Sequence, residues 1–282
     1  MGWNLKILIF STAVFCLIFL YARIGVLANP APPVVSDVMA TDPVDLNACS
    51  TVVIWCNATI SDATDWKNID TVNATFWDPA ATTIDASDDN STHYTNSTCR
   101  LEANYSLTDV PANCSFTVQY YANPADWTCK MYANNTAGES GSNSKTDVTI
   151  NTLRALDAND TINFGALSPG ANSTADVNNT IVNCGNVVID LNLNGTNLTN
   201  ASATLANISV SSVKYNVTNP GQDYTANMTS LSATPTYANF TLAKRTNGGL
   251  SLNNTHWKIG IPASIENLIF TGNITFTAVA DT

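Results

Sequence analysis

Charged and catalytic side chains are scarce in this chain. Asp, Glu, Lys and Arg make up only 12% of its 282 residues, against roughly 25% in ordinary soluble domains. Only two histidines occur: His93 in a stretch rich in Ser, Thr and Asn, and His256 beside a tryptophan in an expected strand. We expect both on the surface or at a sheet edge. No Gly-x-Ser-x-Gly, P-loop or His-Glu-x-x-His motif is found. The sequence therefore predicts no enzyme, no catalytic residue and no cofactor.

Spacings typical of metal sites are also missing. No Cys-x-x-Cys pair or His-rich tract occurs. Asp85, Asp88 and Asp89 form an acidic cluster, but it lacks the turn glycine and the terminal glutamate of a calcium-binding EF-hand loop. We expect a solvated turn there and no metal site.

Positive charge is in deficit. Eleven Lys and Arg face 22 Asp and Glu, which gives a net charge of −11 and an isoelectric point near 4.3. Loss of Lys6 and Arg23 with an N-terminal leader would leave nine basic residues and a net charge of −13. Such a surface repels nucleic acid and anionic lipid, so neither is an expected partner.

Sites for N-linked glycosylation are abundant. The chain has 36 Asn and 59 Ser or Thr, and random placement would produce roughly seven or eight Asn-x-Ser/Thr sequons, the acceptor motif. It has nineteen. The excess predicts covalent N-glycans on an exported protein, although a chain this rich in Asn and Thr also makes some sequons by accident. The sequons begin at Asn57, Asn73, Asn90, Asn96, Asn104, Asn113, Asn134, Asn159, Asn172, Asn178, Asn194, Asn197, Asn200, Asn207, Asn216, Asn227, Asn239, Asn253 and Asn273.

Residues 1–28 have the pattern of a signal peptide. Lys6 supplies the positive start, Ile7–Leu20 is an apolar run, and the small-residue end at Ala28 suits a signal peptidase. Cleavage would leave the mature chain without a membrane span and place it outside the cell or on its surface. The alternative is a retained anchor, because Ile7–Ala28 is long enough to cross a bilayer.

Six cysteines follow the leader, which fits an oxidising compartment. They are Cys49, Cys56, Cys99, Cys114, Cys129 and Cys184. In a strand, alternate residues share a face, so Cys56 lies on the same face as Ile54 and Ala58, and Cys129 on the same face as Trp127 and Met131. The two apolar faces predict a Cys56–Cys129 bridge between sheets. We expect the other four to form disulfides as well. Cys99 and Cys114 would tie a surface excursion, and Cys49 and Cys184 would join the two halves unless Cys184 stays free or pairs between chains.

Around these two cysteines, Pro33–Leu156 resembles an immunoglobulin-like β-sandwich. Cys56 would be the cysteine of the second strand and Cys129 that of the sixth, 73 residues later. Trp127 stands where such domains usually have a corner tyrosine, and parity places Phe76 inside and Trp77 outside. The resemblance implies a first domain of two antiparallel sheets over residues 29–156.

Residues 157–282 predict a second antiparallel sandwich of Greek-key or jelly-roll type. Apolar alternation is punctuated by Pro-Gly, Asn-Gly and Gly-Gly turns, and no sustained helical period occurs. The segment is loosely similar to modules of prokaryotic, especially archaeal, surface and filament proteins. The expected strands are Thr161–Gly165, Thr180–Asn183, Val187–Leu193, Ile208–Val210, Tyr237–Ala243, His256–Ile261 and Leu268–Val279.

Two functions fit this all-β glycoprotein. The first is a structural surface protein, either an envelope component or a filament subunit, which self-associates or binds other surface proteins through strand edges. The Pro-rich segment Asn29–Val35 is the candidate arm that would add a strand to a neighbour. The alternative is an adhesin or receptor-like module that recognises a glycan or a protein. Sugars on most faces would leave little bare surface for a ligand, which favours the first.

Overall fold

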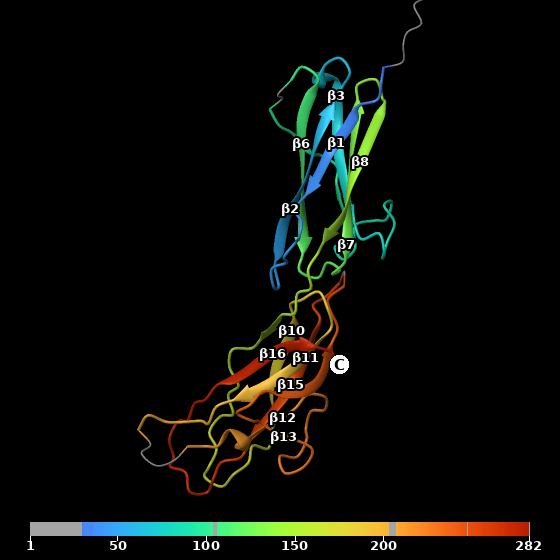
Figure 1. Cartoon of the computed structure of the whole chain (residues 1–282). Coiled ribbons are helices and arrows are strands. Elements are labelled where there is room, and N and C mark those ends of the chain that lie inside the picture. Colours follow the sequence, from blue (N-terminus) through green and yellow to red (C-terminus); the bar gives the residue numbers. More distant parts are fainter. Residues whose placement is uncertain (1–29, 104–105, 203–206, 247, 282) are drawn as a thin grey trace, which may run out of the picture.

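A computed structural model describes residues 30–281 except 104–105, 203–206 and 247. It shows two β-sandwiches placed end to end (Figure 1). Two short 3-10 turns, η1 (Trp66–Asn68) and η2 (Val210–Ser212), are the helical elements of the described residues. The predicted all-β class is therefore confirmed. The predicted leader lies outside the described residues, and within them no helix is long and apolar enough to cross a membrane.

The N-terminal sandwich has two four-stranded sheets with antiparallel ladders. The first has the order β1 (Val34–Ala40), β2 (Thr51–Ser61), β6 (Asp109–Gln119) and β5 (Arg100–Leu101). The second has the order β4 (His93–Asn96), β3 (Ile69–Trp77), β7 (Asp126–Asn135) and β8 (Ser140–Thr149). This order is consistent with the immunoglobulin-like arrangement.

The core of this sandwich follows from period-2 alternation. Ile54, Cys56, Ala58 and Ile60 of β2 are buried, whereas their neighbours reach solvent. The central β2–β6 ladder runs without a bulge over all eleven residues of both strands. A continuous ladder of this kind keeps every inward residue in register with the facing sheet.

The aromatic centre of this core also matches the parity of the sequence. A Cys56–Cys129 disulfide links β2 to β7. Phe76 is fully buried and stacks on Trp127 with ring centroids 4.7 Å apart, while Trp77 is half-buried. Trp127 donates its indole N–H to the Asn123 carbonyl at 3.0 Å, which satisfies its one polar atom.

The N-terminal segment is not a free arm. Val34–Ala40 pairs with β2 as an edge strand, and Val35 is buried in the core. Asn135 donates its side-chain N–H to the Ala31 carbonyl at 3.0 Å, and Asn143 donates to the Val35 carbonyl at 3.2 Å. The expectation that Asn29–Val35 is available to a neighbour is therefore wrong for its described part, because this chain's own sheets already bind it.

The C-terminal sandwich is built from shorter strands. Its five-stranded sheet has the order β13 (Thr229–Ser230), β12 (Val213–Asn216), β15 (Leu252–Ile259), β10 (Val177–Asn183) and β9 (Leu156–Ala158). Its three-stranded sheet has the order β14 (Thr236–Leu242), β11 (Ile189–Gly195) and β16 (Ile274–Ala280). A core centred on Trp257, Leu191 and Leu193 fills the space between them.

Two strand predictions in this half were wrong. Thr161–Gly165 alternates as a strand would, but it joins no ladder. Ile208–Val210 supplies only a single bridge, from Ile208 to Leu198, before η2 begins. The short strands β9, β12 and β13 were not predicted, since two to four residues are too few to show a period.

The junction between the sandwiches is tied by covalent and hydrogen bonds. Cys49 and Cys184 form a disulfide across it, and Cys99 pairs with Cys114 within the N-terminal sandwich. Asn186 is buried. It accepts from the Leu153 amide at 2.7 Å and donates to the Asn151 carbonyl at 3.0 Å. The linker backbone is thus anchored to the β10–β11 turn.

Candidate functional site

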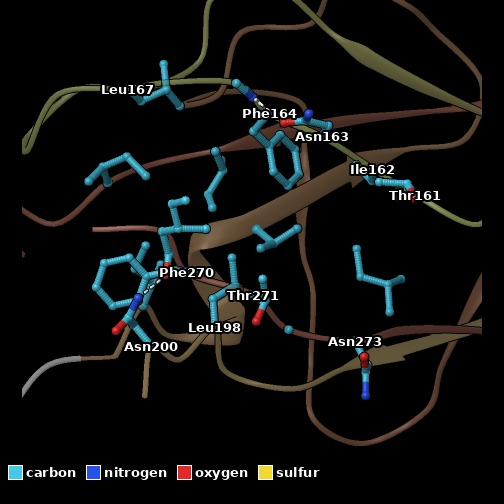
Figure 2. Close-up of a pocket in the computed structure, with 18 of the residues that line it drawn as sticks. Thr161, Ile162, Asn163, Phe164, Leu167, Leu198, Asn200, Phe270, Thr271 and Asn273 are labelled. Carbon is cyan, nitrogen blue, oxygen red and sulfur yellow. Dashed lines mark hydrogen bonds between the residues drawn. The ribbon is translucent and has the colours of Figure 1, made fainter. Parts of the chain in front are cut away.

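A cavity of about 1090 Å³ opens in the C-terminal sandwich (Figure 2). Its walls are the segment 159–169, the segment 261–273 and strand β16. Half of its lining residues are large aliphatic or phenyl side chains: Ile162, Phe164, Leu167, Leu198, Ile208, Val213, Leu231, Ile259, Ile261, Ile265, Leu268, Ile269, Phe270, Ile274 and Phe276. A cavity of this size, lined by both apolar and polar groups, is a candidate binding site.

One wall is an extended segment without a strand partner. Ile162 and Phe164 are half-buried, whereas Thr161 and Asn163, which also line the cavity, are exposed (Figure 2). Asn163 accepts from the Gly165 amide at 2.9 Å, and Gly165 takes the positive φ of 71° that this turn needs. The alternation is that of a β-strand, but among the described residues no strand pairs with this segment.

The opposite wall leaves apolar side chains in solvent. Leu268 is 42% exposed and Ile269 is 81% exposed. Asn200 donates its side-chain N–H to the Ile269 carbonyl, and a bridge between Thr199 and Thr271 fixes the backbone behind it. Exposed leucine and isoleucine beside an apolar cavity are typical of a surface that a partner covers.

Strand β16 forms the third wall and has an open edge. It pairs with β11 from Ile274 to Ala280, and among the described residues no strand pairs with its other edge. Ile274 and Phe276 point from it into the cavity lining, and Phe276 contacts the Trp257 ring edge-on at 5.7 Å. Unpaired N–H and C=O groups therefore lie beside apolar pockets. This combination accepts an extended peptide.

The cavity offers little for catalysis. Its ionisable lining residues are the carboxylates Asp160 and Glu266, and the lining includes no histidine, cysteine or lysine. Polar contacts come from asparagine, threonine and backbone groups. The lining thus lacks the nucleophile–base pair of a Ser-His or Cys-His site.

The structure also places the glycosylation sequons. None of the eighteen described sequon asparagines is buried, and Asn104 lies outside the described residues. By contrast, the four buried asparagines are not sequon acceptors: Asn135, Asn179, Asn183 and Asn186. Every described acceptor thus reaches solvent, as attachment of a sugar requires.

Acceptor exposure differs between the sandwiches. Nine acceptors, all in the C-terminal sandwich, are exposed: Asn159, Asn172, Asn178, Asn197, Asn207, Asn227, Asn239, Asn253 and Asn273. The six described acceptors of the N-terminal sandwich are half-buried. Two examples show why these asparagines are partly buried. Asn96 donates its side-chain N–H to the Ser115 carbonyl at 2.8 Å, and Asn57 faces Asn113 across the β2–β6 ladder.

Both histidines lie deeper than the sequence predicts. His93 is 2% exposed, and its ring nitrogens lie 2.8 Å from Asp88 Oδ1 and 2.9 Å from the Ile84 carbonyl. His256 is 8% exposed and contacts Asn178 at 2.8 Å. Each ring has a local polar partner, so burial costs little. The surface placement predicted for them is therefore wrong, although His93 does lie on an edge strand, β4, whereas His256 lies on the internal strand β15.

In the acidic cluster, the carboxylate of Asp89 stabilises a turn. Asp89 accepts from the backbone amides of Ser91, Thr92 and His93. Burial acts to raise the pKa of Asp89, but these hydrogen bonds outweigh it and leave the pKa below its usual range. Among the described residues, no three His, Cys, Asp or Glu side chains are grouped closely enough to hold a metal ion.

Comparison with known proteins identifies no family. No family model and no curated protein matches the chain. One solved structure in the comparison is Escherichia coli alpha-2-macroglobulin activated by porcine elastase, with 12% identity and a TM-score of 0.21. The match covers 87% of this chain and 22% of that protein. A TM-score this low does not establish a common fold.

Proposed function

We propose that this protein is a secreted, N-glycosylated structural component of a cell surface, and that copies of it assemble through strand edges. It would serve as an envelope component or as a subunit of an extracellular filament. The open edge of β16 beside the apolar cavity carries this proposal. The occupant is a second copy of the chain, which would contribute an extended segment along β16.

The chemistry of the cavity supports a peptide occupant. An added strand presents side chains alternately to the two sides, so every second residue would enter the lining near Ile162, Phe164 and Phe276. Its backbone would meanwhile bond to the free edge of β16. In the adhesin alternative, the polar residues that also line the cavity, such as Asn200 and Asn273, would bind a glycan.

Export is supported by the disulfides and the sequons. Three disulfides are typical of an oxidising compartment. The acceptor asparagines lie at the surface of both sandwiches, where sugars hydrate a protein that has few charges. A glycosylated outer face also blocks unwanted pairing of sheets, the task that charged residues perform in other proteins.

Sedimentation of the full-length protein tests the assembly. Phe164→Asp places a charge in the cavity wall, in a segment that belongs to no ladder, so the fold should persist. We expect the wild-type protein to form large assemblies at high concentration and the variant to stay monomeric. Ser168→Asp is the matched control, because it adds the same charge to an exposed residue of the same segment that does not line the cavity.

Two results would overturn the proposal. A wild-type chain that remains monomeric at high concentration while binding a defined sugar would favour the adhesin. Equal assembly of the wild type and the Phe164→Asp variant would show that the cavity is not the contact. Glycopeptide mapping of native material tests the glycoprotein part, and peptides bearing no sugar at all would contradict it.

A further inference from the structure

A lysine, an asparagine and an aspartate meet at the junction of the two sandwiches. Asn123 lies in the turn between β6 and β7, Asp78 directly follows β3, and Lys244 follows β14 of the other sandwich. Lys244 donates from Nζ to Asn123 Oδ1, and Asn123 donates from Nδ2 to Asp78 Oδ2 at 2.9 Å. The carboxamide is therefore held between an amine and a carboxylate.

The surroundings are those of a partly dry site. Asp78 is 2% exposed, and its Oδ1 accepts from the Ala80 amide at 3.0 Å. The backbone of Asn123 is fixed on both sides, because its N–H donates to Ser91 and its carbonyl accepts from Trp127. Lys244 is also within 3.4 Å of the Tyr121 carbonyl. Asn123 is consequently held in place.

From this arrangement we infer that Lys244 and Asn123 form a covalent isopeptide bond between the two sandwiches, with Asp78 as the proton carrier. The inference does not depend on the proposed function. Nζ touches Oδ1, and Oδ1 is bonded to Cγ, so the amine stands beside the carbon that it attacks. Holding two reactants at contact distance removes much of the entropic part of a barrier.

The reaction balances without any co-reactant. The lone pair of Lys244 Nζ attacks Asn123 Cγ, and the Nζ–Cγ bond forms. Asp78 takes a proton from Nζ and delivers it to Nδ2, to which it is already hydrogen-bonded. The Cγ–Nδ2 bond then breaks and one ammonia leaves. No atom is oxidised or reduced.

Two further observations favour this chemistry. Burial lowers the pKa of Lys244, although the charges of Asp78 and Asp89 oppose the shift, and a lower pKa makes the neutral, nucleophilic amine more available. Asn123 precedes Pro124 and Ala125, so it begins no sequon and no sugar competes for its Nδ2. The other described lysines with hydrogen bonds from Nζ, Lys145, Lys214 and Lys258, donate to backbone carbonyls.

The bond would join the sandwiches a second time. The Cys49–Cys184 disulfide already links them, but a reductant opens it. An amide would persist under reduction and denaturation. Arg245 stacks over the Tyr121 ring at 4.8 Å and helps to hold Lys244 at the junction.

Intact-mass measurement tests the bond directly. The full chain is produced in an oxidising compartment of a host without N-glycosylation, shown to be folded by circular dichroism, and then reduced and denatured. We expect a mass lower than that of the mature sequence by one ammonia. Tryptic digestion should give one branched peptide joining Lys244 to Asn123, with no cleavage after Lys244.

Substitutions identify the side chains that form the isopeptide bond. Lys244→Ala and Asn123→Ala should each restore the full mass, and Asp78→Ala should restore it while leaving both reacting side chains present. Asn123→Asp should lose one water in place of ammonia. Lys214→Ala is the matched control and should keep the loss, since the amine of Lys214 contacts the carbonyl and the ring of Tyr224 and not Asn123.

The branched peptide is decisive, because succinimide formation at an Asn-Gly pair such as Asn194-Gly195 also releases ammonia. A folded wild-type protein with its full mass, cleaved normally after Lys244, would overturn the inference. A loss of ammonia that persists in Lys244→Ala would overturn it too.

Discussion

The two sandwiches solve the same packing problem in different ways. The N-terminal one has long ladders, two internal disulfides and half-buried sequon asparagines. The C-terminal one has shorter strands, no internal disulfide among its described residues, and nine exposed acceptors. It also holds a large cavity beside an open strand edge. The contrast shows that one chain can contain a densely packed core and a core that holds a large cavity.

The difference follows from strand length and cross-linking. Eleven-residue strands supply enough inward side chains to fill the space between two sheets. Where strands are short, the segments 159–169 and 261–273 take their place, and they pack less densely around the core. In this account the N-terminal sandwich provides stiffness, and the C-terminal sandwich provides the contact surface.

Removal of the Cys56–Cys129 disulfide should have the largest effect. The bridge closes a loop of 73 residues, and in the chain-entropy model its loss costs about 4 kcal/mol. The Cys56→Ala/Cys129→Ala double variant should lose hydrogen-exchange protection in the N-terminal sandwich and retain it in the C-terminal one. Cys99→Ala/Cys114→Ala is the control, with a shorter loop and a cost of about 3 kcal/mol. An equal loss of hydrogen-exchange protection in both sandwiches would show that the two sandwiches do not unfold independently.

The next largest loss of stability is expected from a substitution of a buried carboxylate in the C-terminal sandwich. Asp190 is fully buried on β11 and accepts from the Phe240 amide at 2.8 Å and the Thr241 amide at 2.6 Å. Asp190→Asn removes the negative charge that strengthens these two hydrogen bonds and the one donated by the Tyr237 hydroxyl, and we expect a loss of about 2 kcal/mol. Urea unfolding measures it. The exposed Asp160→Asn should change stability by less than about 0.5 kcal/mol, and a similar cost at both sites would be inconsistent with this assignment.

Paired isoleucine substitutions compare the two cores. Ile54 is fully buried opposite Phe116, so Ile54→Val should cost about 1 kcal/mol. Ile162 already borders the cavity, so Ile162→Val should cost less than about 0.5 kcal/mol. Urea unfolding of both variants checks the difference. A larger cost at Ile162 would mean that the cavity is closed in solution.

The smallest effect is a pH dependence in the N-terminal sandwich. Burial acts to raise the pKa of Asp62, but hydrogen bonds from Asn68, Thr64 and Asp65 prevail and hold it at about 2. Because the folded pKa lies below the unfolded value near 3.8, this stability is present above that value and is lost as the pH falls toward 2. The loss is on the order of 1 kcal/mol. Unfolding at several pH values should show it in the wild type and not in Asp62→Asn.

Much of the N-terminal sandwich was predictable, and less of the C-terminal one. Alternation around Cys56 and Cys129 indicates which faces turn inward, and long strands repeat that signal many times. Thr161–Gly165 carries the same alternation without a partner strand. Alternation reports which way side chains point, but it does not report whether a neighbouring backbone is present.

The side-chain sites were less predictable. The burial of His93 depends on Asp88 and on the Ile84 carbonyl, whose positions are set by a turn rather than by a periodic pattern. The contact of Lys244 with Asn123 spans 121 residues and joins two turns. No local pattern signals such a contact. The cavity itself has no sequence signature, because its lining comes from segments that are far apart along the chain.

Electron microscopy of native material tests the central claim most directly. We expect polymers or sheets in which neighbouring copies meet at the C-terminal sandwich, with density from one copy lying along β16 and filling the cavity walled by Phe164. Isolated, monomeric particles with an empty cavity at high concentration would contradict it.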